Sequence, residues 1–190
     1  MPSHSAFALF DTAIGICAVI WSGRGVCGVQ LPEGAAGAVR GGVLKRFPGA
    51  RETEPPENMK HAIEGMTALL GGHARDFDGV PLDLARVPGF NRKVYDVARA
   101  IPPGKTMTYG EVAERLGDKS LARAVGQALG ENPIPLIIPC HRVLAAGGKA
   151  GGFSAPGGTI TKLRLLTIEG AQPGGPTLFD HLPLEGPPRR

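Results

Sequence analysis

The sequence predicts an α/β N-terminal domain, with a small antiparallel sheet plus helices, followed by a mostly α C-terminal domain with a helix-turn-helix. Three observations lead to this fold class. Apolar, β-branched runs crowd residues 5–31, helical periodicity dominates after Pro88, and a capping signal stands at Thr108. We expect the two domains to span residues 1–80 and 81–170. Residues 171–190, rich in proline and glycine, should form a C-terminal extension.

The N-terminal domain should begin with three strands and continue with two helices. The strands are predicted by apolar runs at residues 7–10, 14–21 and 26–29, with a hairpin turn at 22–25. Residues 33–47 favour a helix that four glycines weaken. Residues 58–70 favour a stronger helix, because apolar side chains recur on one face before Gly71 and Gly72 end it.

The C-terminal domain should open with a helix that runs to Ile101 and stops at Pro102-Pro103-Gly104. Its charge is distinctive: residues 86–170 hold 12 Lys/Arg and 6 Asp/Glu, net +6, whereas residues 1–85 have a net charge of −2. A basic half suggests an anionic partner such as nucleic acid. The alternative is a solvated surface with spare cations.

Two short helices should follow. Thr108 and Glu111 have the spacing of a capping box, and Gly117 closes the helix that they open. Ser120 is expected to cap the next helix, which runs to about Leu129. Two short helices joined by a tight glycine-containing turn predict a helix-turn-helix.

The second of these helices has one apolar and one small, exposed face. A helical wheel groups Leu121, Val125, Ala128 and Leu129 on the apolar face. Arg123, Gly126, Gln127 and Gly130 point the other way. Such a face lets backbone amides approach phosphates closely while the arginine enters a groove or the base stack. The alternative is an ordinary helix pair with one solvated arginine.

Composition excludes several classes of protein. The chain has 190 residues, 42% hydrophobic and 20% charged, which is typical of a globular protein. Its apolar runs are too short to cross a membrane, and its first residues show no signal peptide, so we expect a cytoplasmic protein without a membrane partner. Three cysteines also favour a reducing compartment.

We expect neither metal nor cofactor. Cys17, Cys27, His61 and His73 have no spacing typical of structural zinc. The paired glycines are typical of helix ends and turns rather than of a dinucleotide-binding or methyl-donor loop.

Pro139-Cys140-His141-Arg142 is the strongest candidate for a reactive site. A free thiol is mostly protonated near neutral pH, and a basic histidine or a nearby cation is the usual means of generating the thiolate. Pro135 and Pro139 would hold the sulfur in place. Taken alone, the pair is also compatible with an inert buried cysteine.

The order of several short motifs resembles one family. Met107-Thr108-Tyr109-Gly110, Ala122-Arg123-Ala124-Val125-Gly126, Glu131-Asn132-Pro133, Ile138-Pro139-Cys140-His141-Arg142-Val143, Leu165-Leu166 and Glu169-Gly170 follow one another. This series resembles the O6-alkylguanine-DNA alkyltransferases, the methylated-DNA–protein-cysteine methyltransferases. The resemblance is specific over residues 88–170 and general before them.

The resemblance implies a catalytic set. Cys140 would attack the alkyl carbon, His141 would take its proton through a water, and Glu169 would orient His141. Tyr109 could give a proton to the departing guanine, and Asn132 would tie the helix-turn-helix to the active-site strand. A thioether is a poor leaving group, so the protein would be consumed, one alkyl group per chain.

The resemblance also implies the partner and its contacts. A monomer would bind double-stranded DNA carrying O6-alkylguanine and would flip the damaged base out of the duplex. O4-alkylthymine is a second candidate lesion. Arg123 would fill the gap in the stack. The other expected DNA contacts are Thr108, Ala122, Ala124, Gly126 and Gln127. The base pocket would contain Leu129, Arg142, Val143 and Ser154, with the carbonyls of Cys140 and Val143 reading the guanine amine.

Two segments depart from the family pattern. The loop after the cysteine has Phe153 where the family often has tyrosine, and Ala155-Pro156 are extra. In the last helix Lys162-Leu163-Arg164 lacks the usual tryptophan. These changes could alter which alkyl groups fit.

Three other functions stay open at this point: a non-catalytic lesion-binding protein of the same fold, a helix-turn-helix regulator with a redox-sensing thiol, and a cysteine hydrolase. The first would lack the cysteine, and the second would need a dimerisation helix and a resolving cysteine. The basic half and the helix-turn-helix argue against the third.

Overall fold

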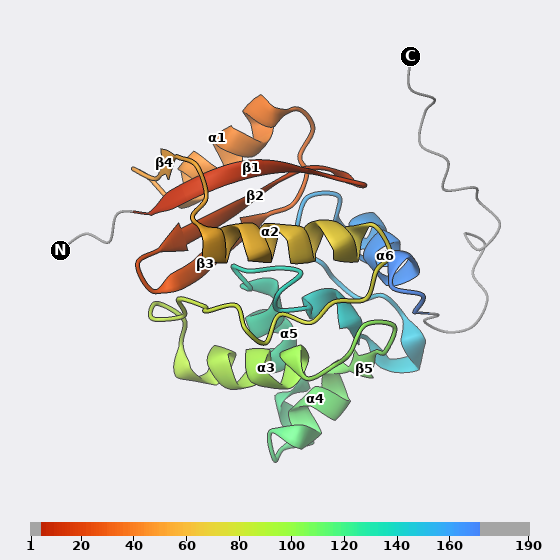
Figure 1. The fold of residues 1–190 in the computed structure, drawn as a ribbon. Coiled ribbons are helices and arrows are strands. Elements are labelled where there is room, and N and C mark those ends of the chain that lie inside the picture. Colours follow the sequence, from red (N-terminus) through yellow and green to blue (C-terminus); the bar gives the residue numbers. More distant parts are fainter. Residues whose placement is uncertain (1–4, 172–190) are drawn as a thin grey trace.

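The computed structural model describes residues 5–171, and the extension predicted at 171–190 lies almost entirely outside them. The N-terminal half contains a four-stranded sheet in the order β3-β2-β1-β4 (Figure 1). Its strands are β1 (Ala6–Thr12), β2 (Gly15–Ser22), β3 (Gly25–Gln30) and β4 (Arg51–Glu52). The first three are antiparallel, as predicted, and the two-residue β4 adds to β1 in parallel. The sheet is therefore mixed.

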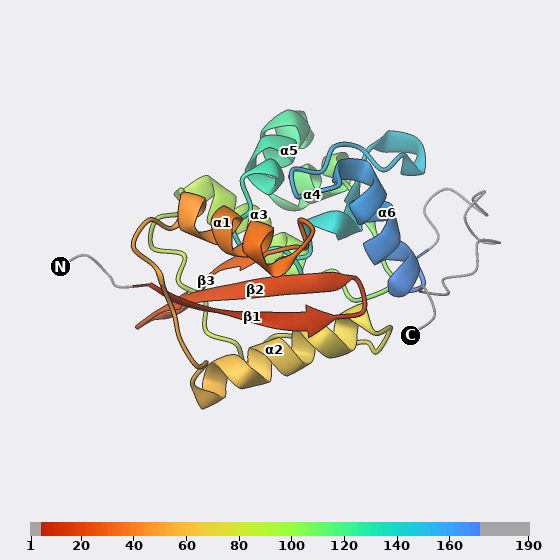
Figure 2. The same ribbon diagram turned by 90° about the horizontal axis from the view of Figure 1, so that it is seen from above.

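Helices α1 (Ala36–Arg46) and α2 (Glu57–Leu70) cover opposite faces of this sheet (Figure 2). Alternation along the strands explains this arrangement, because successive side chains of a strand point to opposite faces. Phe7 and Ile20 pack in one cluster with Val43 of α1. Ala8 and Val19 belong to the other cluster, together with the apolar stripe of α2.

The C-terminal half is mostly helical. It contains α3 (Gly89–Arg99), α4 (Tyr109–Arg115), α5 (Ala122–Gly130) and α6 (Gly158–Ile168), with 3₁₀ turns η1 (Lys119–Leu121), η2 (Cys140–Arg142) and η3 (Ala146–Gly148). A short parallel pair, β5 (Met107–Thr108) and β6 (Val143–Leu144), joins the start of α4 to the segment after η2. This pair brings the helix-turn-helix and the Cys140 segment together.

The predicted capping box at the start of α4 is confirmed. The Glu111 backbone N–H donates to the Thr108 hydroxyl at 3.2 Å, and the Thr108 N–H donates to the Glu111 carboxylate at 2.6 Å. The prediction that Ser120 caps the next helix is wrong. Asp118 accepts the Ser120 N–H at 2.8 Å and starts the turn η1, so α5 begins only at Ala122.

The two halves share one hydrophobic core. A single cluster of buried residues runs from Ala8 in the sheet through Met66 and Tyr95 to Leu165 in α6. Hydrogen bonds also cross between the halves, since the Val29 N–H donates to the Pro133 carbonyl at 2.9 Å. A division near residue 80 stays a prediction. In the part of the chain that is described, no helix is both long and apolar enough to span a membrane.

Candidate active site

Cys140 lies at the end of a buried apolar run that Asn132 holds at both ends. The Ile134 N–H donates to Asn132 Oδ1 at 2.9 Å, and Asn132 Nδ2 donates to the Ile138 carbonyl at 2.8 Å. The Cys140 N–H donates to the same Ile138 carbonyl at 2.8 Å. Within the run, Leu136 adopts a φ of 75°, a left-handed conformation that side chains rarely take. The backbone before the thiol is therefore closely constrained.

The side chains of His141 and Glu169 form a buried pair. His141 Nε2 lies 2.9 Å from Glu169 Oε1, and both side chains are almost completely inaccessible to solvent. Burial lowers the pKa of His141 despite the neighbouring Glu169 carboxylate, so the ring is neutral at pH 7. Because a carboxylate only accepts hydrogen bonds, Nε2 carries the proton. The lone pair is then on Nδ1, which is buried and has no hydrogen-bond partner among the described residues.

Arg142 fixes the Glu169 carboxylate from the other side. Its Nε and Nη2 donate to the two Glu169 oxygens at 2.9 and 2.8 Å, and its Nη1 donates to the Ile101 carbonyl at 2.5 Å. Burial tends to raise the pKa of Glu169, but the hydrogen bonds from His141 and Arg142 outweigh it and hold the value at about 2. Glu169 is therefore an anion throughout the physiological range.

The Cys140 thiol is protonated at rest. Burial raises its pKa, and the opposing effects of the Asn132 side chain, the Lys162 charge and nearby backbone groups do not compensate. A thiol of this kind needs a base to become a nucleophile. The free Nδ1 of the adjacent His141 is a base of the right kind.

Lys162 is a component of the site that the sequence patterns did not single out. It is fully buried on α6, where its Nζ donates to the Val143 carbonyl at 2.6 Å and lies 5.6 Å from the centre of the Tyr109 ring. Burial lowers its pKa to about 8. Its spacing from Leu165 and Leu166 places it on the apolar face of α6, which is the signal that could have revealed it.

A cavity of about 570 Å³ opens beside Cys140 and brings together many of the predicted residues. Segments α4, α5 and 152–154 contribute its walls. Its lining consists of Tyr109, Ala122, Arg123, Gly126, Leu129, Gly130, Cys140, Gly152, Phe153 and Ser154. Tyr109 stands against α5, because a Cβ built on Gly126 would lie 3.8 Å from its ring. The helix-turn-helix thus forms one wall of the space in front of the thiol.

The other predicted residues lie around this cavity rather than in its lining. Arg142, expected in the base pocket, points instead to Glu169 and Ile101. The Val143 carbonyl, expected to read a guanine amine, accepts a hydrogen bond from Lys162. Thr108 and Asn132 make the capping and backbone contacts given above. Ala124 is half-buried and Gln127 exposed on α5.

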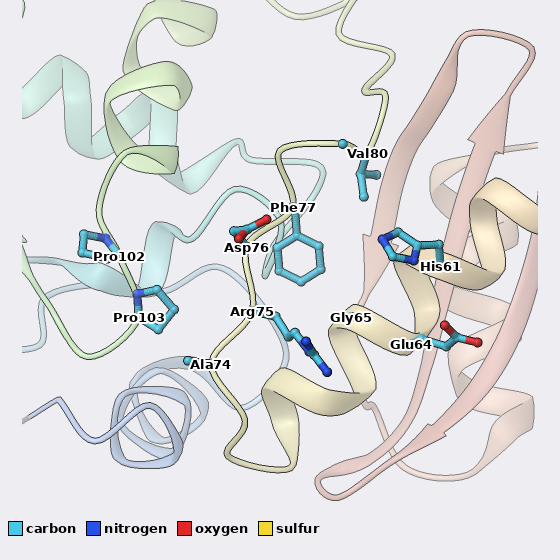
Figure 3. A pocket seen from close by; sticks show the side chains of 11 residues that line it. His61, Glu64, Gly65, Ala74, Arg75, Asp76, Phe77, Val80, Pro102 and Pro103 are labelled. Atoms are coloured by element: carbon cyan, nitrogen blue, oxygen red, sulfur yellow. The ribbon is translucent and has the colours of Figure 1, made fainter.

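A separate cavity of about 560 Å³ lies between α2 and the segment 74–80 (Figure 3). His61 and Glu64 of α2 line it together with Arg75, Asp76 and Phe77, and the His61 ring lies on the side of α2 toward Phe77. It contains none of the residues around Cys140, so we do not assign it to the active site. Among residues 5–171, no three His, Cys, Asp or Glu side chains form a group able to hold a metal ion.

Comparison with known proteins identifies the family. A family model described as "6-O-methylguanine DNA methyltransferase, DNA binding domain" matches residues 89–171. The methylated-DNA–protein-cysteine methyltransferase of Methanothermobacter thermautotrophicus is 38% identical over 152 residues, which cover 80% of this chain and 78% of that protein. The protein of the same name from Mycolicibacterium paratuberculosis is 43% identical over 129 residues, 67% of this chain and 76% of its own.

Solved structures agree with the sequence relatives. Mycobacterium tuberculosis OGT in complex with DNA has a TM-score of 0.71 and 33% identity, covering 87% of this chain and 92% of that one. The O6-methylguanine-DNA methyltransferase of Pyrococcus kodakaraensis has a TM-score of 0.67 and 27% identity, covering 87% and 99%. The resemblance found in the sequence motifs is confirmed: this chain belongs to the methylated-DNA–protein-cysteine methyltransferase family.

Proposed function

We propose that this protein repairs DNA by transferring the alkyl group of O6-alkylguanine directly and irreversibly to Cys140, which restores guanine. One observation carries the assignment of the reacting groups. A protonated, buried thiol is followed in the chain by a neutral histidine whose free Nδ1 has no partner among the described residues, while its Nε2 is held by Glu169. This is a cysteine–histidine–carboxylate relay.

The chemistry follows from these groups. His141 takes the thiol proton through a water, and Sγ attacks the alkyl carbon. The S–C bond forms as the C–O6 bond breaks, and the electron pair moves to O6 of guanine. The departing guanine then takes a proton from the Tyr109 hydroxyl, which passes it on. The thiol has lost one proton and guanine has gained one, so the protons balance. A thioether does not release its alkyl group at neutral pH, so each chain acts once.

The helix-turn-helix α4–α5 supplies the DNA-binding surface in this proposal. Arg123 is exposed at the start of α5 and lines the cavity in front of Cys140, with the small residues Ala122 and Gly126 beside it. Small residues permit close approach to a minor groove, and a flipped base leaves a gap that an inserted side chain can fill. We assign Arg123 to that gap and Thr108, Ala124 and Gln127 to backbone contacts.

The base pocket is then the cavity that Tyr109, Leu129 and Ser154 line. Of the alternatives, a lesion-binding protein of the same fold without catalysis is disfavoured by the presence of Cys140.

Three free cysteines support a reducing compartment, and we place the protein in the cytoplasm.

The test is the intact mass of the protein after incubation with duplex DNA carrying a single O6-methylguanine. We expect the addition of one methyl group, mapped to Cys140 by peptide sequencing, and no addition to the Cys140→Ala variant. Retained lesion binding with unchanged mass would favour the non-catalytic alternative.

A further inference from the structure

We propose that Tyr95 and Asn91 of helix α3 are positioning residues, which keep the C-terminal end of α5 aligned with Cys140 during alkyl transfer. This inference rests on the proposed function and adds two residues to it. Neither residue lines the cavity beside Cys140. Their effect on the reaction therefore passes through α5.

Helix α5 needs support from outside at its C-terminal end. It has nine residues, and a helix this short depends on packing against its neighbours for stability. The last carbonyl groups of a helix also lack their usual backbone partners. Arg123 is exposed near the other end and, at a rise of about 1.5 Å per residue, lies roughly 7.5 Å along the axis from Ala128. Any force that DNA exerts on the exposed end must be resisted near Ala128.

Tyr95 provides the first support. Its side chain is fully buried, and its hydroxyl donates to the Ala128 carbonyl at 2.9 Å. Burial raises the pKa of Tyr95 to about 12, although the neighbouring Asn91 side chain acts in the opposite direction. The hydroxyl is therefore protonated throughout the physiological range and always available as a donor.

Asn91 provides the second support, one turn earlier on α3. It is buried, and its Nδ2 donates to Glu131 Oε2 at 2.9 Å. Glu131 is the residue that follows the last turn of α5. Residues one turn apart lie on the same face of a helix, so Asn91 and Tyr95 hold the end of α5 from one side of α3.

The supported segment leads directly to the nucleophile. Leu129 and Gly130 lie between the two contacts and line the cavity beside Cys140. Glu131 is followed by Asn132, whose side chain holds both ends of the run before Cys140. Displacement requires sulfur, carbon and O6 to lie roughly in line, and a misplacement of about 1 Å can lower a rate by about 10²-fold. Movement of this short segment should therefore slow the transfer step.

The first experiment compares Tyr95→Phe, which removes only the hydroxyl oxygen, with Ser22→Ala. Ser22 is a matched control, because it is also buried, its hydroxyl donates to Asp83 at 2.6 Å, and it does not line the cavity. We expect Tyr95→Phe to lower the single-turnover rate constant at saturating O6-methylguanine DNA about tenfold, while the dissociation constant for the duplex stays within about twofold. Ser22→Ala should change neither quantity, although both variants should lose stability in denaturant unfolding.

The second experiment tests the Asn91 contact without changing a buried residue. Glu131 is exposed, so neither Glu131→Ala nor Glu131→Gln should impair folding. Both remove the charge, but glutamine keeps an oxygen that can accept the Asn91 hydrogen bond. We expect the saturating rate constant to fall about threefold in Glu131→Ala, in keeping with the loss of one modest hydrogen bond, and to be retained in Glu131→Gln.

Three results would overturn the inference. A saturating rate constant within twofold of the unsubstituted protein in folded Tyr95→Phe would show that its hydroxyl does not align α5. Weaker duplex binding with an unchanged saturating rate constant would assign the contacts to DNA binding alone. Equal rate constants in Glu131→Ala and Glu131→Gln would exclude the Asn91 contact. Failure of the proposed function is distinguishable from all three, because the unsubstituted protein would then transfer no methyl group to Cys140.

Discussion

His141 Nε2 lies 2.9 Å from Glu169 Oε1, and neither side chain is accessible to solvent. This contact decides which ring nitrogen carries the proton and therefore which one can accept a proton from Cys140. The Glu169→Gln substitution should preserve the shape of the side chain. Because an amide can donate as well as accept a hydrogen bond, glutamine would no longer require His141 to carry its proton on Nε2. We expect the rate of methyl transfer to fall by about 10²–10⁴, in the range typical of a lost general-base arrangement. Single-turnover kinetics with O6-methylguanine DNA will measure it.

The same carboxylate should make stability depend on pH. The pKa of Glu169 is lowered from 4.5 to about 2 in the folded protein, so its ionisation stabilises the fold above pH 4.5, and this stabilisation is lost as the pH falls toward 2. The difference corresponds to about 3 kcal/mol. Urea unfolding between pH 6 and pH 2 should show the loss, and Glu169→Gln should lack this component. An identical pH dependence in the variant would contradict the assignment.

Arg142 should matter for folding as well as for chemistry. Arg142→Met leaves the Glu169 carboxylate buried with one partner fewer, which should lower the free energy of unfolding by about 3–5 kcal/mol. Arg40 and Glu52 form a similar two-point pair at the surface, with distances of 2.6 and 3.0 Å. Arg40→Met is therefore the control and should change stability little. Equal effects in the two variants, measured by denaturant unfolding, would count against a special role for the buried pair.

Arg123 should be needed for duplex DNA but not for the chemistry itself. Arg123→Ala should slow repair of O6-methylguanine in a duplex by at least tenfold while reaction with free O6-benzylguanine stays within about twofold, because a free base needs no flipping. Arg115→Ala, which removes another exposed arginine, from α4 and outside the cavity, controls for the lost charge. Equal losses on both substrates would refute the intercalating role.

Lys162 should support the reactive state of Cys140. Its charge lowers the pKa of the buried thiol, and its Nζ holds the Val143 carbonyl. In Lys162→Met the pH dependence of the reaction with free O6-benzylguanine should move to higher pH, with a rate about tenfold lower at pH 7 for each pKa unit by which the thiol is shifted. Lys149→Met, at an exposed position, should leave the profile unchanged. A lower rate without a displaced profile would assign Lys162 a purely structural role.

Local patterns were sufficient for most of the fold. The first three strands follow from their apolar, β-branched runs, and α4 follows from the capping-box spacing of Thr108 and Glu111. The two-residue strands β4, β5 and β6 could not be predicted, because their pairing depends on distant segments rather than on their own composition. Asp118 and Ser120 are both residue types that favour the N-cap position of a helix. Asp118 occupies that position at η1, because its side chain accepts the Ser120 N–H.

The site was predictable where one motif carries the chemistry and not where distant side chains converge. The Cys140-His141 pair and Glu169 could be proposed from the motifs. That Arg142 would hold Glu169 rather than line the pocket depends on where Ile101 and α6 pack. The spacing of Lys162 from Leu165 and Leu166 could have placed it on the apolar face of α6, but its contacts with the Val143 and Gly152 carbonyls depend on how α6 packs.

The proposed mechanism limits each chain to one alkyl group, accepted on Cys140, and to one restored guanine. The most direct measurement titrates a fixed amount of protein with excess duplex O6-methylguanine DNA and counts the guanines restored and the S-methylcysteine formed. We predict that both reach one per protein chain and then stop. Restoration of several guanines per chain, or loss of O6-methylguanine without S-methylcysteine at Cys140, would rule out single-use transfer to this thiol.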